Sequence, residues 1–145
     1  MYTKKDFTTA LIKLGFVQDV NTKTCGSHVR YYHSIYPNIY AGIDDHKNTK
    51  EMSQNICMEL TRTMLLIVFL ECRKENGEID YKKAENMLKE IDKSMAVELL
   101  TRLKKLNGKS MLLSIIPKRL ATEVSKAKKN LTEESILSYI EKLRD

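Results

Sequence analysis

Four hydrophobic residues near the N-terminus recur at helical spacing. They are separated by steps of three, one and three residues, so they share one face of a helix. Thr3 precedes them as a capping residue, and Gly15 follows them as a residue that readily takes the positive φ found at helix ends. The side chains that we expect this helix to bury are Phe7, Ala10, Leu11 and Leu14.

The residues after this helix show patterns typical of strands. Phe16 and Val17 begin an extended segment, and residues 28–33 and 39–43 are rich in aromatic and β-branched side chains. A turn at residues 36–38 joins the last two segments. In a regular strand, successive side chains point to opposite faces. One face would hold His28, Arg30 and Tyr32, and the other would hold Val29, Tyr31 and His33.

From about residue 49 onward the hydrophobic residues keep helical spacing. A long helix is expected from residue 48 or 49 to Lys74, and its centre is apolar on all sides, which predicts that it forms the core. Shorter helices are expected to begin at Asp80, Ser94 and Thr132, and Pro117 interrupts the segment before the last of them. Their expected buried side chains are Ala84, Met87, Leu88 and Ile91, then Ala96, Leu99, Leu100 and Leu103, then Ile136, Leu137, Ile140 and Leu143.

These patterns together predict an α+β fold. Residues 1–48 form a small α+β region with a helix and two to three strands, and residues 49–145 form a helical region. The N-terminal helix and its small antiparallel sheet pack on a predominantly helical C-terminal bundle. At 145 residues, the chain favours one compact unit that includes both regions.

Composition excludes several classes of protein. Hydrophobic residues make up 42% of the chain, which is too many for a disordered protein. The five glycines are too scattered for a dinucleotide-binding turn or a P-loop, so no nucleotide cofactor is expected. The longest apolar run, residues 64–70, is too short to cross a membrane. Because there is no signal-peptide pattern and the three cysteines are unpatterned, we expect a cytoplasmic protein without disulfides.

Two short motifs resemble a known family. Leu14-Gly15-Phe16 ends the first helix, and Gly26-Ser27-His28 opens an aromatic strand that is followed by another strand and a helix. This arrangement, over residues 3–67, resembles the HicA-type messenger-RNA interferases, whose fold is similar to double-stranded-RNA-binding domains. The resemblance implies metal-independent RNA cleavage with His28 as the catalytic residue, and an acidic antitoxin-like partner. The spacer at residues 17–25 is longer than in that family, and the helical region has no counterpart there.

The chemistry of this segment suits RNA cleavage on physical grounds as well. RNA carries its own nucleophile, the 2′-hydroxyl, so cleavage needs a base and cations that stabilise the developing charge. A histidine such as His28, with an ordinary pKa near 6.5, can take that proton near neutral pH. Arg30 lies two residues along the same strand face and can contact a phosphate oxygen. The alternative is that His28 packs against Tyr32 at the strand edge and has no chemical role.

A metal site near the same segment is disfavoured. Cys25, His28, His33 and His46 are residue types that bind zinc. However, His28 and His33 fall on opposite faces of a regular strand, and the four residues match no familiar zinc-finger spacing. We therefore expect no metal.

Basic residues are concentrated in one stretch of the chain. The chain holds 25 Lys and Arg against 19 Asp and Glu, a net charge of +6, while residues 102–129 hold nine basic residues and one acid, Glu123. Such a field can attract a phosphate backbone, although a solvated helix face is the common alternative. The predicted nucleic-acid contacts are Lys104, Lys105, Lys109, Lys118, Arg119, Lys126, Lys128 and Lys129.

Two functions therefore remain open from the sequence. The first is a nucleic-acid-binding protein, for RNA more than DNA, that includes a ribonuclease if the resemblance holds. Tyrosines 31, 32, 36 and 40 could stack on bases in this case, or could simply cover a core. The second is a non-enzymatic regulator of mobile-element type that binds an acidic protein or forms a homo-oligomer. Residues 56–70 and the final helix would then form a dimer or a partner-binding bundle.

Overall fold

The computed structural model of the chain describes residues 2–20, 28–44, 52–106 and 111–144. These residues form an α+β fold with one small sheet, as the sequence predicts. The elements are α1 (Lys4–Lys13), β1 (Phe16–Gln18), β2 (His28–His33), β3 (Tyr40–Asp44), α2 (Gln54–Cys72), α3 (Tyr81–Met87), α4 (Lys93–Lys105), α5 (Met111–Ile115), α6 (Lys118–Lys128) and α7 (Glu133–Glu141).

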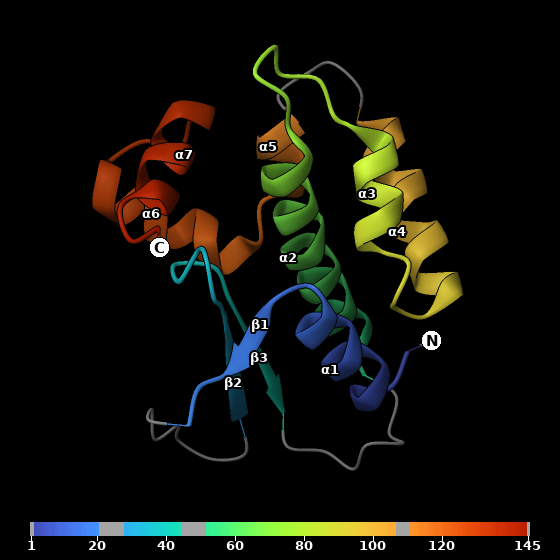
Figure 1. Cartoon of the computed structure of the whole chain (residues 1–145). Coiled ribbons are helices and arrows are strands. Elements are labelled where there is room, and N and C mark those ends of the chain that lie inside the picture. Colours follow the sequence, from blue (N-terminus) through green and yellow to red (C-terminus); the bar gives the residue numbers. More distant parts are fainter. Residues whose placement is uncertain (1, 21–27, 45–51, 107–110, 145) are drawn as a thin grey trace.

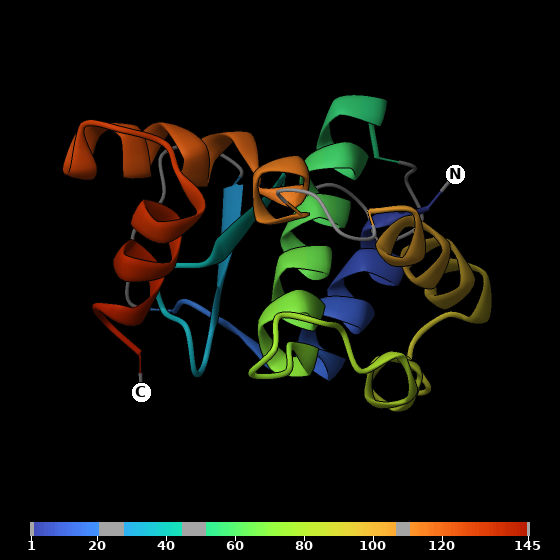
Figure 2. The same ribbon diagram turned by 90° about the horizontal axis from the view of Figure 1, so that it is seen from above.

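The sheet lies between two groups of helices. Helices α1 and α2 pack on one face, and α6 and α7 lie on the side of the other face (Figures 1 and 2). Helices α3 and α4 pack on α2 away from the sheet. We call the sheet face toward α1 and α2 the inner face, and the face toward α6 and α7 the outer face. None of the helices in the described part of the chain is both long and apolar enough to cross a membrane.

The strands run antiparallel in the order β1-β2-β3. Phe16 pairs with His33, and Tyr32 pairs with Tyr40. The expected alternation along β2 is confirmed where side chains are described, because Tyr31 and His33 are buried on the inner face whereas Arg30 and Tyr32 are only partly buried.

Both expected ends of the long helix are wrong. The long helix begins at Gln54, where the hydroxyl of Ser53 accepts a hydrogen bond from the Ile56 amide, and Met52 and Ser53 are not helical. It ends at Cys72 instead of Lys74, because Arg73 is extended and pairs with Ile79. In residues 73–79 the chain instead reverses direction, with Arg73 and Ile79 paired in an antiparallel bridge.

The fourth expected helix, α4, begins one residue before Ser94. Asp92 is its N-cap and its carboxylate accepts a hydrogen bond from the Met95 amide at 3.0 Å. Ser94 instead shares a hydrogen bond with the Tyr2 hydroxyl. The buried face of α4 also differs from the expected one, because Met95 is buried and Ala96 is only partly buried.

The C-terminal segment also departs from expectation at two positions, Leu137, which is only partly buried, and Leu143. Pro117 separates α5 from α6, as predicted, and is the N-cap of α6. Ile136 and Ile140 of α7 are fully buried. However, Leu143 is 54% exposed. Helix α7 ends at Glu141, so Leu143 does not continue the buried helical face of Ile136 and Ile140.

One hydrophobic core joins the sheet to the helices. Helix α2 runs through it, and its residues 64–69 are all buried. The same cluster includes Phe7 from α1, Ile43 from β3, Leu99 from α4 and Ile136 from α7. The expected boundary between residues 48 and 49 lies outside the described residues.

A buried histidine connects α1 to β2. The Nε2–H of His33 donates to the Leu14 carbonyl oxygen at 2.9 Å, and its Nδ1 accepts from the amides of Ile35 and Tyr36, each at 3.2 Å. Both ring nitrogens are therefore used by the neutral imidazole. Burial lowers the pKa of His33 below its ordinary value. Gly15 makes this contact possible, because a Cβ at that position would lie 2.9 Å from Nε2.

Replacing Gly15 tests this packing. Gly15→Ala adds a backbone penalty at φ +98 and a clash with His33, so we expect the free energy of unfolding to fall by about 3 kcal/mol. Gly77→Ala is the matched control, because Gly77 has φ +88 but no atom within 4 Å of its Cβ position, and a loss of about 1 kcal/mol is expected. Urea denaturation measures both. Equal losses would contradict a close contact between Gly15 and His33.

The pH dependence of stability tests the neutral state of His33. Its pKa is lowered in the folded chain, so the unfolded chain, with a pKa near 6.5, binds the proton more readily. This contribution to stability is complete above about pH 6.5 and is lost as the pH falls below it, by up to about 1.4 kcal/mol per pH unit. Urea denaturation at about pH 7.5 and about pH 5.5 measures the slope. His33→Gln should reduce the slope, and an unchanged slope would contradict the assignment.

Candidate nucleic-acid interface

Two arginines meet one tyrosine on the outer face of the sheet. The guanidinium carbon of Arg30, on β2, lies 3.8 Å from the ring centroid of Tyr40, and that of Arg119, on α6, lies 5.1 Å from it. The Arg119 guanidinium also lies beside Gly42 of β3, where a Cβ would be 3.4 Å from its Nη2, an ordinary van der Waals distance. The contacts place two permanent cations beside one aromatic ring.

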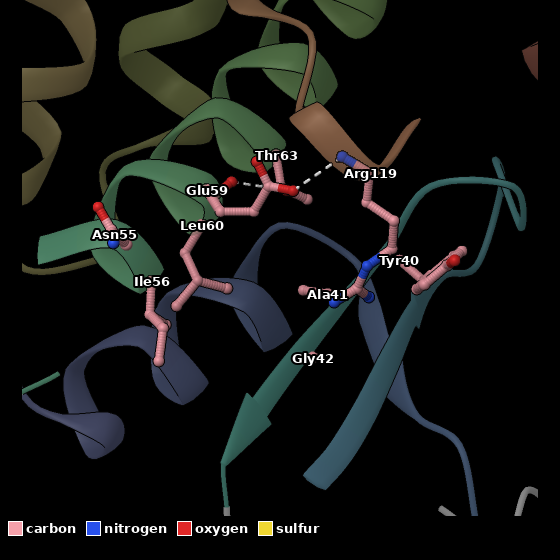
Figure 3. Close-up of a pocket in the computed structure, with 9 residues that line it drawn as sticks. All are labelled: Tyr40, Ala41, Gly42, Asn55, Ile56, Glu59, Leu60, Thr63 and Arg119. Atoms are coloured by element: carbon pink, nitrogen blue, oxygen red, sulfur yellow. Dashed lines mark hydrogen bonds between the residues drawn. The ribbon is translucent and has the colours of Figure 1, made fainter. Parts of the chain in front are cut away.

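A glutamate on α2 fixes the start of α6. Pro117 provides no side-chain cap, and the first amides of a helix have no partner within the helix. The Glu59 carboxylate accepts hydrogen bonds from the amide of Lys118 at 2.9 Å and from the amide of Arg119 at 3.1 Å. Figure 3 shows the bond to Arg119. This negative charge also offsets the positive end of the helix dipole. Glu59 therefore determines where the cations of the first turn of α6 lie.

A second glutamate holds the middle of α6 against the sheet. Tyr40 and Tyr139 both donate from their hydroxyls to the Glu123 carboxylate, Tyr139 at 3.3 Å. Burial raises the pKa of both tyrosines, and the carboxylate raises it further, so both hydroxyls stay protonated donors near neutral pH. Asn38 adds a hydrogen bond from its amide to the Tyr139 carbonyl oxygen at 2.6 Å. The sole acid of residues 118–129 is thus directed toward the sheet and α7.

The remaining charges of α6 face solvent. Residues 118–129 hold five basic residues, and the side chains of all five are exposed. None of them forms an ion pair with a carboxylate of the described chain. We call these five residues the α6 cations: Lys118, Arg119, Lys126, Lys128 and Lys129.

The structure separates the predicted basic residues into two groups. Lys104 and Lys105 are exposed on α4, and Figures 1 and 2 show α4 on the opposite side of α2 from α6. Lys104 lies near the ring of Tyr81, 6.0 Å from its centroid. Lys109 lies outside the described residues. Arg119 and Arg30 therefore meet at the sheet, and the other α6 cations lie on the same helix as Arg119 or at its C-terminal end, whereas the basic residues of α4 lie on the far side of α2.

Of the histidine and cysteine side chains, the structure describes those of His33, Cys57 and Cys72. His28 is the first residue of β2 and its backbone pairs with Asp44, but its side chain lies outside what the structure describes, as do Cys25 and His46. His33 is only 2% exposed, and both of its nitrogens are hydrogen-bonded. Within the described ranges, no three His, Cys, Asp or Glu side chains are grouped to hold a metal ion.

Cys72 is poorly placed for nucleophilic chemistry. Cys72 is buried, and burial raises its pKa to about 11. Its Sγ lies 3.3 Å from Met87 Sδ, within the core. Cys57 is half-buried on α2. A thiol with so high a pKa as Cys72 is a poor nucleophile near neutral pH.

The four tyrosines of the sheet region divide between its two faces. Tyr31 and Tyr36 are in the core, at 6% and 4% exposure. Tyr32 and Tyr40 are partly buried on the outer face. The ring of Tyr40 already contacts Arg30 and Arg119. The alternative that tyrosines cover a core is therefore correct for two of the four.

Three residues of this interface were missed by sequence reasoning. Glu59 and Tyr139 were not singled out, and Glu123 was noted only as an isolated acid. They contact partners at least 16 residues away in sequence, and Glu59 meets amides 59 and 60 residues distant. A charge count along the chain carries no signal for such contacts.

Comparisons of the chain with protein-family models, with curated proteins and with solved structures give no match.

Proposed function

We propose that the protein binds RNA through its phosphate backbone and that the α6 cations are the principal contact surface. The observation that carries this proposal is the orientation of Glu123. Its carboxylate is engaged by Tyr40 and Tyr139, so it faces the sheet and leaves five cations exposed along one helix. Cations without carboxylate partners keep their field available to a polyanion.

Arg30 extends this surface from α6 onto the sheet. Its guanidinium lies against Tyr40, as does that of Arg119, so the two elements present charge side by side. Guanidinium groups bind phosphate oxygens through paired hydrogen bonds, and they stack on bases. We infer that the ligand is single-stranded RNA, because single strands offer both phosphates and unpaired bases. We place this role in the cytoplasm.

The second sequence-based function, a regulator that associates through apolar helix faces, receives less support. Most of residues 56–70 and the apolar residues Ile136 and Ile140 of α7 are buried within the chain's own core. These side chains already have partners in the same chain. A polar, cationic surface on α6 thus remains the better candidate for binding, with an acidic protein as the competing partner.

Salt dependence tests the RNA proposal. Binding of a single-stranded RNA should weaken steeply with salt, because each phosphate contact releases a counterion. Replacing Lys126, Lys128 and Lys129 together by Gln should weaken binding and reduce the slope of log affinity against log salt by about 2. Fluorescence anisotropy measures both.

The matched control removes equal charge elsewhere. Lys82, Lys83 and Lys89 are exposed on or just after α3, away from α6 (Figure 1). Their combined replacement by Gln changes net charge equally and should leave the slope within about one phosphate contact of the unmodified protein. The proposal fails if RNA does not bind at low salt, or if both triple variants lose affinity equally.

We further propose that His28 makes the protein a ribonuclease of the HicA-like kind. This proposal rests on the resemblance of residues 14–16 and 26–28. It also uses the order of elements from α1 through the three strands to α2, with His28 first in the middle strand. Arg30 lies two residues further along that strand, where it can contact a phosphate.

Cleavage of RNA in the presence of a chelator tests this second proposal. The unmodified protein should cleave without metal, and His28→Ala should lower the rate by at least about a hundredfold, because the base that takes the 2′-hydroxyl proton is lost. His28→Ala should still bind RNA with the same salt slope, as anisotropy can show. Equal cleavage by both proteins, or no cleavage by either, would leave RNA binding standing and reject the catalytic role.

A further inference from the structure

A cavity lies next to the first turn of α6. It has a volume of about 200 Å³, is partly open, and is lined by residues of β3 and α2 and by Arg119 (Figure 3). Ile56 and Leu60 extend from α2 toward β3, and Ala41 and Gly42 form the facing wall. The wall formed by Ile56 and Leu60 and the facing wall formed by Ala41 are apolar, and Gly42 contributes no side chain that would fill the space.

The remaining lining groups are polar and lie at the edges of the cavity. The Arg119 side chain reaches from α6 down to β3, so its planar guanidinium borders the space (Figure 3). Asn55 and Glu59 border it from α2. An amide both donates and accepts hydrogen bonds, and each carboxylate oxygen can accept a further one beyond its bond to an α6 amide.

These walls fit a flat ring with a polar edge. Aliphatic side chains and a guanidinium plane both pack against the faces of a nucleobase, and amide and carboxylate groups read its edge. The volume is below the roughly 300–1,000 Å³ of pockets that hold a whole drug-sized ligand. A single base therefore fits, with its sugar and phosphate outside.

We propose that this cavity accepts one unpaired base of an RNA strand bound along α6. The inference rests on the proposed RNA binding and adds a preference to it. Lys118 precedes Arg119 in the chain, and its exposed side chain can contact the phosphate of the inserted nucleotide. Because a base in a duplex is stacked and paired, the cavity selects single strands over double-stranded RNA.

The test compares two probes that share one backbone. One is a short single-stranded RNA, and the other is an abasic ribose-phosphate strand of equal length. Both should bind with the same salt slope, because both offer the same phosphates. The RNA should bind about tenfold more tightly, which corresponds to the stacking of one base.

Filling the cavity should remove this difference alone. Ile56→Trp places a large ring in the space without changing charge, so the affinity for RNA should fall to that of the abasic strand, and abasic binding should not change. Val97→Trp is the matched control, because Val97 is 57% exposed on α4 and borders none of the cavity, and it should keep the tenfold difference. Thermal unfolding of both variants checks that they fold.

A second variant keeps the test informative if Ile56→Trp does not fold. Arg119→Lys keeps the charge but loses the plane on which a base stacks, so the ratio of RNA to abasic affinity should fall toward one. Equal binding of RNA and abasic strand by the unmodified protein would reject the cavity and leave RNA binding intact. Binding of neither strand at low salt would reject both proposals.

Discussion

The position of α6 depends on the Glu59 carboxylate. A helix that begins after a proline without a side-chain cap leaves amides unpaired, and Glu59 on α2 accepts from two of them. Glu59 lies 59 residues before Lys118 and 60 residues before Arg119 in the chain. The interaction therefore ties the C-terminal part of the fold to the central helix. With α6 fixed at its first turn, Arg119 reaches Tyr40 and Glu123 reaches the tyrosine hydroxyls.

The two faces of the sheet have different roles: the inner face stabilises the fold, and the outer face contacts α6. Its inner face holds His33, whose nitrogens are fully used in joining α1 to β2, and whose neutral state is favoured by burial. Its outer face holds Arg30 and Tyr40, which meet α6. His33 therefore serves the fold, and the proposed catalytic role belongs to His28, at the other end of the same strand.

The α6 surface combines features that are weak when taken singly. Lysines on a helix are commonly only solvated, and an arginine beside a tyrosine is a frequent surface contact. Here the acid that could neutralise the helix is held by Tyr40 and Tyr139, and a cavity of nucleobase size opens beside Arg119. The contacts of Glu123 show which side of α6 carries unpaired positive charge, and the cavity indicates the shape of a ligand. A count of lysines shows neither.

The sequence by itself determined the local structure and the fold class. The spacing of Phe7, Ala10, Leu11 and Leu14 sufficed for α1, and the alternation along residues 29–33 sufficed for the two faces of β2, because both patterns depend on neighbours within a few residues. Helix ends were less well predicted, since Asp92 and Ser94 are both good caps and tertiary contacts decided between them. Only the tertiary structure separated Lys104 and Lys105 from the α6 cations and directed the Glu123 carboxylate toward Tyr40 of the sheet. Such contacts join residues far apart in the chain, and no local periodicity records which distant side chain will supply the hydrogen bond.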